Sequence, residues 1–518
     1  MRGNARTSRI VAYAASGALV ISGTFLAVHP AAAAPDPQPS NDAAAWLADE
    51  LDGGMFTGAF SQGLSIDAAL ALDEIGGQDA AVDGVSSALE PVVGDYISYE
   101  GYVYAGSAAK AAVLAQVAGA NASAYGEYDL IAEVEDKVAT AAPSAGRVPD
   151  TNVLGQAFAS RSLAVAGSSR AADATAFLLK QQCSSGYFRL DYNSNPAAAN
   201  QSCVNGTDAP DTDVTAITVT QLRAQPATPA ITSAIARATS WLAGQQRCDG
   251  SYGGGVSTEG SNSNSTGLAA WALGDTPASR QAATWLRKHQ ATAADAGNEL
   301  GDDLGAIAYD DAALTAGRSS GITDATRDQW RRTTAQAAPG LAWFSTDPTP
   351  ALSLTGPTGY VKQATLQTLR TSGAAAGTVV CVTGPLASTR GIAAANGLSS
   401  VVRVPGGTAT RVYTAKDPYG HVDTVALKVL GQKTLPVTRS QYKVKRNRTV
   451  TTMISGLVPG EWSRIFYKGK LVRSGKATST GRFAATFNVG RARGKKTVVG
   501  YGYFTDIRRG ATTIKVRR

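Results

Sequence analysis

Acidic side chains cluster where a general acid or base could stand. Asp208, Asp211 and Asp213 precede the apolar, helix-like segment Val214–Arg223. A proton donor needs a carboxyl that burial, neighbouring carboxylates or hydrogen bonds keep neutral, and an Asp-x-Asp pair offers such a setting. Helix capping explains the same residues more simply. Asp213 is expected to cap the helix Val214–Arg223, with Asp211 favoured by the helix dipole.

A second acidic group surrounds Leu304 to Tyr309 and comprises Glu299, Asp302, Asp303, Asp310 and Asp311. Paired carboxylates perform the acid and base steps of glycosidases. Acid pairs also open helices, and Asp302-Asp303 fits a helix start, so we predict no catalytic residue. Tyr309 and Asp310 form the best local candidate for ligand contact. Asn264-Ser265-Thr266 is interpreted as a helix cap.

Histidine and cysteine limit the chemistry further. Beyond the first 34 residues only His289 and His421 remain, which disfavours a histidine-rich metal site and a Ser-His-Asp hydrolase. We therefore predict no metal site and no cofactor. Cys183 and Cys203 bracket an Asn-rich loop and are predicted to form a disulfide. Cys248 and Cys381 are the remaining pair, and their pairing stays open.

The elements that must position these residues are helical from 41 to 373. This Ala-rich region has apolar residues at spacings of three and four, interrupted by Gly, Asn, Pro and Asp clusters. It also repeats itself. Phe177-Leu178-x-x-Gln181-Gln182 precedes Gly186-Tyr187-Phe188, and Trp241-Leu242-x-x-Gln245-Gln246 precedes Gly250-Ser251-Tyr252. Trp285 to Gln290 begins a third copy, and Trp46 to Phe56 is a degenerate first copy.

These copies resemble the Gln-Trp repeats of the terpene cyclase and prenyltransferase superfamily, as in squalene cyclases. The resemblance covers about 300 residues and implies an α/α toroid of paired inner and outer helices. It also implies that inner-helix starts line one mouth of a cavity, where Asp208, Asp211 and Asp213 would contact a ligand. Two features disfavour an enzyme. The cyclase acid motif ends in two consecutive aspartates, whereas Val214 holds the last position here, and no zinc-ligand set is present.

After Gly373 the sequence changes to short alternating strands separated by Gly and Pro. We predict a small β-domain at 374–432 and a second β-module at 433–518. Both resemble bacterial immunoglobulin-like sandwich modules, which implies adhesion or spacing rather than chemistry. The expected fold class is therefore multidomain, an all-α toroid followed by all-β sandwiches.

The net charge of +8 conceals a strong asymmetry. Residues 433–518 carry 21 Lys and Arg against two acids, a net +19, whereas residues 35–432 carry 24 against 38, a net −14. Such asymmetry favours a polyanionic partner for the last module. Basic side chains that serve only solubility are the alternative. Nucleic acid is not expected as the partner.

The first 34 residues predict that the protein is exported, so such a partner would lie outside the cytoplasm. Arg2, Arg6 and Arg9 precede an apolar stretch and the small-residue site Ala32-Ala33-Ala34, a pattern typical of a secretory signal peptide. Residues 35–40 form a linker. A membrane anchor is the alternative for the apolar stretch, and no later span is expected.

We therefore expect a secreted or cell-wall-associated binding protein. Its toroid would hold an apolar or glycan ligand or a partner, and its basic module would dock to an anionic cell-envelope polymer. Three alternatives stay open: an extracellular enzyme acting on a glycan or isoprenoid, a small-molecule carrier like the cobalamin-binding proteins of animals, and a structural envelope protein.

Overall fold

The computed structural model describes residues 34–518 except 59–60 and 347–350, so the predicted signal peptide lies outside the described residues apart from Ala34. The chain divides into two compact units. The first comprises the residues up to Thr349 together with 377–379 and 417–420, and the second comprises the remaining residues from Pro350 onward. The first is helical and the second is built of β-sheets, which confirms the predicted fold class. No helix in the described part is long and apolar enough to cross a membrane.

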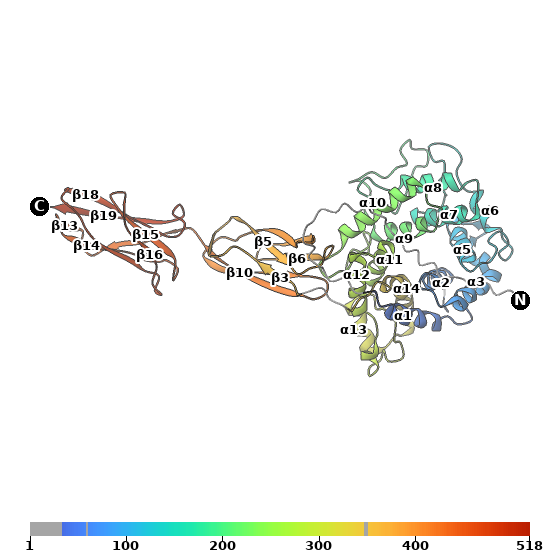
Figure 1. Ribbon diagram of the computed structural model, residues 1–518. Helices are drawn as coiled ribbons and strands as arrows, with labels where there is room; N and C mark the ends of the chain where they lie inside the picture. Colours follow the sequence, from blue (N-terminus) through green and yellow to red (C-terminus); the bar gives the residue numbers. More distant parts are fainter. Residues whose placement is uncertain (1–33, 59–60, 347–350) are drawn as a thin grey trace, which may run out of the picture. The chain divides into compact units, whose positions relative to one another are not determined.

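The helical unit is organised around a closed ring of inner helices. Each inner helix packs on the next, and the last packs on the first. In ring order these helices are α2 (Ser61–Ile75), α5 (Ala105–Val117), α7 (Val153–Ala166), α9 (Thr212–Arg223), α11 (Ser263–Leu273) and α14 (Asp324–Leu341), coloured blue to yellow in Figure 1. This closed ring makes the unit a toroid.

An outer helix packs on each inner one. The outer helices are α1 (Gln38–Asp49) on α14, α3 (Asp79–Leu89) on α2, α6 (Leu130–Glu135) on α5, α8 (Ala171–Lys180) on α7, α10 (Pro229–Gln245) on α9 and α12 (Pro277–Lys288) on α11. Shorter elements lie in the connections, namely α4 (Val93–Ile97), the hairpin β1 (Ser98–Tyr99) and β2 (Tyr102–Val103), and α13 (Asp311–Ser320). Since α1 packs on α14, the first helix completes the last pair.

The repeated glutamines connect neighbouring pairs. The Nε2 of Gln246 donates to Gly250 O at 3.0 Å and to Ala278 O, in the next outer helix, at 2.8 Å. Gln182 makes the same two bonds, to Gly186 O and Ala234 O. Gln290 donates to Gly305 O at 3.1 Å and to Pro39 O at 2.8 Å, and the second bond joins the last repeat to the start of α1. The third repeat therefore has a turn too, with Gly305 to Ile307 in place of the Gly-x-aromatic element.

The glycine of each turn is required by close approach to the next outer helix. A Cβ built on Gly250, whose φ is +93°, would lie 2.7 Å from Gln281 O, and one on Gly186 would lie 2.5 Å from Arg237 O. Each turn is fastened to its inner helix as well, because the backbone N of Tyr252 donates to the hydroxyl of Thr266 at 2.9 Å. Phe188 and Thr215 make the equivalent bond.

The β unit contains two sandwich modules with separate cores. The first module packs the sheet β4-β10-β9-β6-β7 with β3-β5-β8. Its strands are β3 (Ser353–Thr355), β4 (Tyr360–Lys362), β5 (Leu366–Ser372), β6 (Val379–Thr383), β7 (Ser388–Ile392), β8 (Leu398–Arg403), β9 (Ala409–Lys416) and β10 (Val422–Leu430).

The second module contains two sheets. One has the strand order β11-β19-β18-β15-β16, with β13 also paired to β19, and the other has the order β12-β14-β17. Its strands are β11 (Lys433–Thr434), β12 (Val437–Arg439), β13 (Lys443–Lys445), β14 (Thr449–Ile454), β15 (Trp462–Tyr467), β16 (Lys470–Lys476), β17 (Phe483–Asn488), β18 (Gly494–Tyr501) and β19 (Arg508–Arg517). The two-residue turn at Lys468-Gly469, both with positive φ, joins β15 to β16 as expected of a hairpin.

The β region begins earlier than the sequence predicts. Helix α14 ends at Leu341, and β3, β4 and β5 lie within Ser353–Ser372, ahead of the predicted start at 374. Leu366 and Leu369 are three residues apart, a spacing that is compatible with a helix. The sequence pattern therefore does not reveal that β5 is a strand whose residues alternate between more exposed and more buried positions. Pairing of β5 with β8 along six residues decides the outcome.

A buried ion pair fixes the second module. Arg508 and Glu461 are 1% and 0% exposed, and the Nε of Arg508 lies 2.7 Å from Glu461 Oε1. Arg508 also donates to Gly431 O at 3.1 Å, at the end of the first module. Removing one partner of such a pair would leave an uncompensated buried charge.

The glutamine bonds give a first test. Exchanging Gln246 for Ala leaves two buried carbonyls without a donor, and each such loss costs about 1–3 kcal/mol. We expect Gln246→Ala to lower the free energy of unfolding of the helical unit by about 2–4 kcal/mol. Tryptophan fluorescence in urea would measure it, since six of the seven tryptophans lie in this unit.

The neighbouring Gln245 is a matched control. It is exposed, and its amide bonds only to Trp241 O in its own helix. Gln245→Ala should change the unfolding free energy by less than about 0.5 kcal/mol. Equal losses in the two variants would contradict the role given to Gln246.

Candidate functional site

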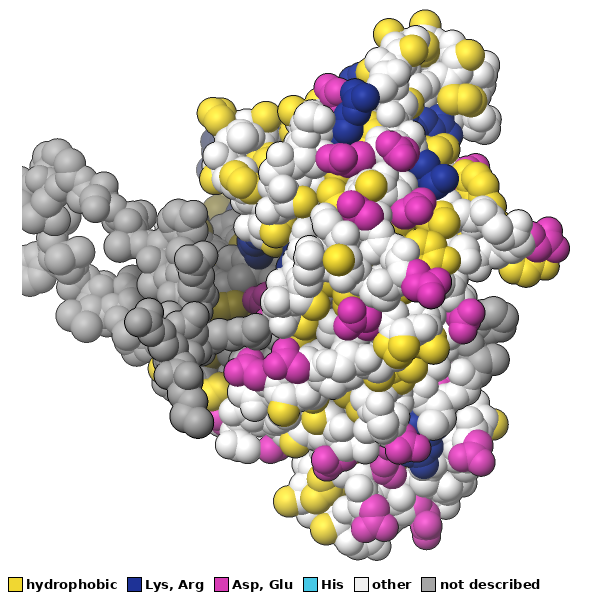
Figure 2. Space-filling model, turned by 90° about the vertical axis from the view of Figure 1, so that its right-hand side faces the viewer, with side chains coloured by type: hydrophobic (Ala, Val, Ile, Leu, Met, Phe, Trp, Pro, Cys, Tyr) yellow, Lys and Arg dark blue, Asp and Glu magenta, His cyan; other side chains and the backbone are white. Residues whose placement is uncertain are grey.

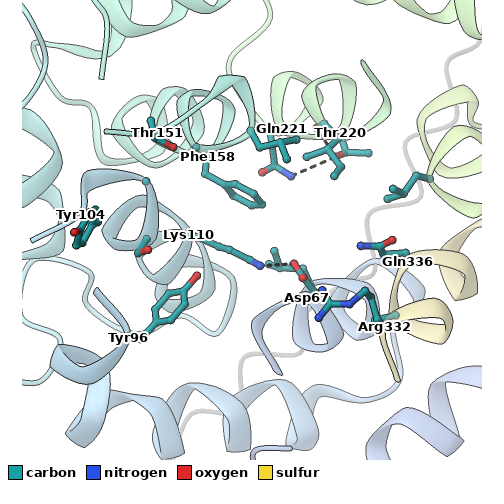
Figure 3. A pocket seen from close by; sticks show the side chains of 18 of the residues that line it. Asp67, Tyr96, Tyr104, Lys110, Thr151, Phe158, Thr220, Gln221, Arg332 and Gln336 are labelled. Carbon is teal, nitrogen blue, oxygen red and sulfur yellow. Dashed lines mark hydrogen bonds and ion pairs between the residues drawn. The ribbon is translucent and has the colours of Figure 1, made fainter. Parts of the chain in front are cut away.

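A cavity of about 420 Å³ lies among the inner helices. Every helix of the ring contributes to the wall, and examples in ring order are Asp67, Lys110, Phe158, Ile217, Leu268 and Gln336. Figure 3 shows Lys110 directed toward Asp67 on one side and Phe158 and Gln221 on the opposite side. Leu70, Leu154 and Trp271 add apolar surface, and Asp150, Thr151 and Thr220 add polar groups, so the walls combine apolar and polar side chains. Small-molecule sites have this character.

An ion pair between α2 and α5 is the strongest charge contact in the cavity wall. The Nζ of Lys110 lies 2.6 Å from Asp67 Oδ1, and their side chains are 16% and 27% exposed. Lys110 also donates to Gly63 O at 2.8 Å. Burial is the largest single influence and opposes the charged form of Lys110, but Asp67 and Tyr96 together outweigh it and hold the pKa of the ammonium above its ordinary value. Lys110 is therefore charged at neutral pH.

Arg332 of α14 supplies an exposed cation at the cavity. Among the residues that the structure describes, no carboxylate lies within ion-pair distance of it. It is near enough to Lys110 to lower the pKa of that ammonium slightly. The cavity thus combines a wall of apolar and polar side chains with one cation, Arg332, whose charge is not neutralised by a neighbouring side chain.

Two of the three predicted aspartates, Asp211 and Asp213, lie at the start of α9. Asp211, and not Asp213, is the N-cap, because its Oδ1 accepts from the backbone N of Asp213 at 2.9 Å and of Val214 at 3.0 Å. The helix begins at Thr212, two residues earlier than predicted. Asp213 precedes Ile217 by one turn, so its side chain lies on the cavity-facing side of the helix.

Asp213 has an environment that favours its neutral form. Burial raises the pKa of Asp213 to about 6, the nearby carboxylate of Asp211 adds to the effect, and Ser265 opposes it. Three buried polar atoms here have no hydrogen-bond partner among the described residues: Asp213 Oδ1, Ser265 Oγ and Asn264 Oδ1. Buried polar atoms are normally satisfied, so this group of three at the starts of α9 and α11 fits contact with water or a ligand.

A glycine loop covers these carboxylates. A Cβ on Gly254 would lie 2.4 Å from Asp213 Oδ2, and one on Gly255 would lie 2.1 Å from Asp211 Oδ2. Any side chain at either position would displace the loop or the acid. The sequence shows the glycines, but nothing in it indicates which carboxylates they approach.

The other predicted contact residues have mixed positions. Tyr309 lies near Asp213 and Asp310, whose charges raise the pKa of its phenol after the larger effect of burial. Asp310 caps α13 by accepting from the backbone N of Ala313 at 2.8 Å. Asp208 is engaged elsewhere, since its Oδ2 lies 3.0 Å from Arg189 and accepts from the backbone N of Val204 at 2.7 Å. The structure therefore brings Asp211, Asp213 and Tyr309 together and leaves Asp208 in a loop contact.

Two predicted helix starts are placed differently. Asn262, and not the segment Asn264 to Thr266, caps α11. Asp302 and Asp303 open no helix; they lie in a turn, where Asp303 accepts a hydrogen bond from the indole of Trp46 at 3.0 Å.

The predicted disulfide between Cys183 and Cys203 is confirmed. Cys248 and Cys381 are also disulfide-bonded, so no cysteine is free. The only group of His, Cys, Asp or Glu close enough for a metal in the described part is Cys183, Cys203 and Asp208. Since its two sulfurs are joined to each other, they are not available as thiolate ligands.

Sequence reasoning missed Asp67, Lys110 and Arg332. One signal was available, because Lys110 is the only charged residue in the otherwise small and apolar helix Ala105–Val117. A lone charge on a buried helix generally has a partner or a function. The identity of that partner, 43 positions earlier, depends on the ring.

Comparison with known proteins adds likenesses of fold. No family model matches the chain, and no curated protein matches it. Among solved structures, it is similar to a protein from Actinoplanes, at 18% identity over 60% of this chain and 99% of that one, with a TM-score of 0.41. It is also similar to the type II terpene cyclase MstE from Scytonema, at 15% identity over 60% and 98%, with a TM-score of 0.40.

The β region is similar to fibronectin(III)-like modules of CbhA from Clostridium thermocellum, at 10% identity over 32% of this chain and 93% of that one, with a TM-score of 0.20. At these identities and scores no activity transfers to this chain. The terpene cyclase-like toroid predicted from the repeats is present as the closed ring of inner helices.

The pKa of Asp213 gives a second test. Its pKa is near 6 in the folded protein and near 3.8 in the unfolded chain, so the folded state binds the extra proton between these values. Folding stability from this group therefore falls as the pH rises through that window. We expect Asp213→Asn to raise the free energy of unfolding by about 2–3 kcal/mol above pH ~7, with the gain disappearing below pH ~4.

Denaturant unfolding at a series of pH values would measure this, with the exposed Asp302→Asn as the control. The control should show no such dependence. Destabilisation of Asp213→Asn at every pH would contradict the account of Asp213.

Proposed function

We propose that this chain is an exported, cell-envelope-associated binding protein. Its toroid holds a small ligand in the central cavity, and its last β-module docks to an anionic wall polymer. The observation that carries the proposal is the cavity itself, in which apolar side chains lie beside polar ones and an exposed Arg332. Binding sites for small molecules combine such walls with a few polar anchors.

The lining favours an amphipathic ligand with an anionic group. Phe158, Leu268 and Trp271 would cover an apolar body, and Arg332 would pair with a carboxylate, sulfonate or phosphate. Lys110 contributes less to such recognition because Asp67 already neutralises it. A cavity of about 420 Å³ lies within the ordinary range for small-molecule sites.

Charge supports the docking part of the proposal. Acidic side chains predominate on the face of the helical unit shown in Figure 2. The last module carries 21 Lys and Arg, and its two acids are already engaged, Glu461 by Arg508 and Asp506 by Lys362. Its remaining cations therefore attract an external polyanion.

Export is supported by the leader pattern and by the cysteines. All four are in disulfides, which form and persist in oxidising compartments. The helical unit and the β-modules together fit a modular extracellular protein.

Asp213 favours an extracellular enzyme as a second candidate. A carboxyl with a pKa of about 6 can donate a proton near neutral pH, and it lies one turn from the cavity wall. Under this candidate Asp213→Asn would abolish turnover of a glycan or isoprenoid substrate while leaving its binding intact. Under the binding-protein proposal the same variant would leave ligand retention unchanged.

The cavity can be tested with 8-anilinonaphthalene-1-sulfonate, an apolar probe with one anionic group. We expect fluorescence enhancement on binding to the mature chain. Leu268→Trp fills the cavity and should abolish it, and Arg332→Met should weaken the affinity by about five- to tenfold through loss of a charge-assisted contact. Val165→Trp, at an exposed position outside the cavity, is the control. Enhancement that survives both cavity variants would contradict a ligand site in the toroid.

Docking can be tested on purified Gram-positive cell walls. The full mature chain should sediment with the walls at low salt and be released by a few tenths molar NaCl, because surface charges are then screened. A chain that ends at Gly431 should remain in the supernatant. The last module has its own core, so its removal leaves the cores of the helical unit and of the first module intact. Equal retention of both chains would contradict docking through 433–518.

A further inference from the structure

We propose that the polymer lies on one particular surface of the last module, the outer face of the sheet β11-β19-β18-β15-β16, and that it is an acidic polysaccharide. This inference rests on the proposed docking function and adds its location and the chemical class of the partner. It follows from strand register, from the two acids of the module and from exposed aromatic rings.

Register places a row of lysines across three adjacent strands. Lys515 of β19 is paired with Lys443 of β13 on one side and with Lys495 of β18 on the other. Side chains of paired residues point to the same face, and all three are exposed. Lys445 and Arg517 form the next row. Five cations thus occupy a single block at one end of the face.

Such a row destabilises the sheet by itself. Like charges directly opposite one another on neighbouring strands repel. The module has two acidic side chains, and both are engaged away from this block, Glu461 with Arg508 and Asp506 with Lys362. A bound polyanion would supply the missing negative charge, so the unfavourable row indicates a binding surface rather than a stabilising feature.

The same face carries aromatic rings beyond the lysine block. Arg509, Tyr501 and Arg464 are register partners across β19, β18 and β15. Phe466 packs edge-on against Tyr501, with ring centroids 5.6 Å apart, and Trp462 is 42% exposed. Rings exposed between cations suit the apolar faces of sugar units that carry anionic groups. An acidic polysaccharide meets both requirements.

The face is long enough to require a polymer. Lys515 and Arg509 are six residues apart on β19, or about 20 Å at the rise of an extended strand. Between them lie Thr513 and Ala511, paired with Thr497 and Val499. A single small anion could reach one cation group, whereas a chain could contact both.

The other sheet of the module offers no equivalent surface. Register on β12-β14-β17 places Thr438, Thr451, Met453, Ala484, Thr486 and Asn488 on its outer side. None of these is charged. The contrast between the two sheet faces argues against basic residues that serve only solubility.

Binding to polygalacturonate, an acidic polysaccharide, would test the proposal on the full mature chain. The variant Lys443→Gln/Lys495→Gln/Lys515→Gln removes three charges from the face. The matched control, Arg448→Gln/Arg482→Gln/Arg491→Gln, removes three exposed charges outside the block. We expect at least a tenfold loss of affinity and a smaller salt dependence for the face variant, and less than a threefold loss for the control.

Folding is checked in the same samples. Relief of repulsion should leave the melting temperature of the face variant unchanged or raised. If that variant folds poorly, Lys445→Gln/Arg517→Gln in the next row carries the same expectation. Equal losses in face and control variants would overturn the proposal, because net charge alone would then explain binding.

Further arms identify the ligand chemistry and separate this inference from the proposed function. Trp462→Ala should weaken binding to polygalacturonate severalfold and leave binding to inorganic polyphosphate unchanged, since only the former has sugar rings. Equal effects on both would overturn the polysaccharide assignment. If the wild-type chain binds neither polymer nor purified walls, the docking function itself fails, not only its location.

Discussion

The structure depends on a small set of buried and half-buried amide groups that hold neighbouring helix pairs together. Gln182, Gln246 and Gln290 each donate one hydrogen to the glycine turn of their own repeat and one to the next outer helix. In the repeat that begins with α6, Gln156 donates from the inner helix to Gly146 O and Ala174 O and performs the same role. These groups connect the repeats because their acceptor carbonyls, shielded wholly or partly from water, would otherwise lack this donor.

The ring in turn creates the site. When inner helices stand side by side, residues on their facing sides meet around the axis, so Asp67 contacts Lys110 and Phe158 lies across from them. The starts of α9 and α11 come together as well, with Asp213 beside Ser265 under the loop Gly253–Gly255. Burial there shifts Asp213 toward its neutral form, whereas Asp67 forms an ion pair with Lys110. The two carboxyls therefore differ because their surroundings differ.

Local pattern predicted the toroid, the sandwich modules and the disulfide between Cys183 and Cys203, because each leaves a signature in neighbouring residues. It placed the α9 cap at Asp213 instead of Asp211, since both are good caps and only the fold shows which one turns inward. Each of two repeats has two adjacent glutamines after its aromatic ring, and only the fold shows that Gln182 and Gln246 join the next outer helix. Cavity residues depend on contacts between distant repeats, and the lysine row depends on strand register. A single sequence specifies neither directly.

The bond from Gln290 to Pro39 joins residues 251 positions apart, and the backbone N of Asp36 donates to Phe344 O at 2.6 Å. The chain therefore starts and leaves the ring at the same seam. A linear solenoid has two end repeats from which it can fray, and its units fold in a spreading sequence. A closed ring has only this seam, which forms after the whole helical region has been synthesised. Helix α1 can pack on α14 only after α14 has been made. Once the seam is closed, the unit should unfold as a single cooperative body. Circular permutation at another loop would move the seam without changing the ring.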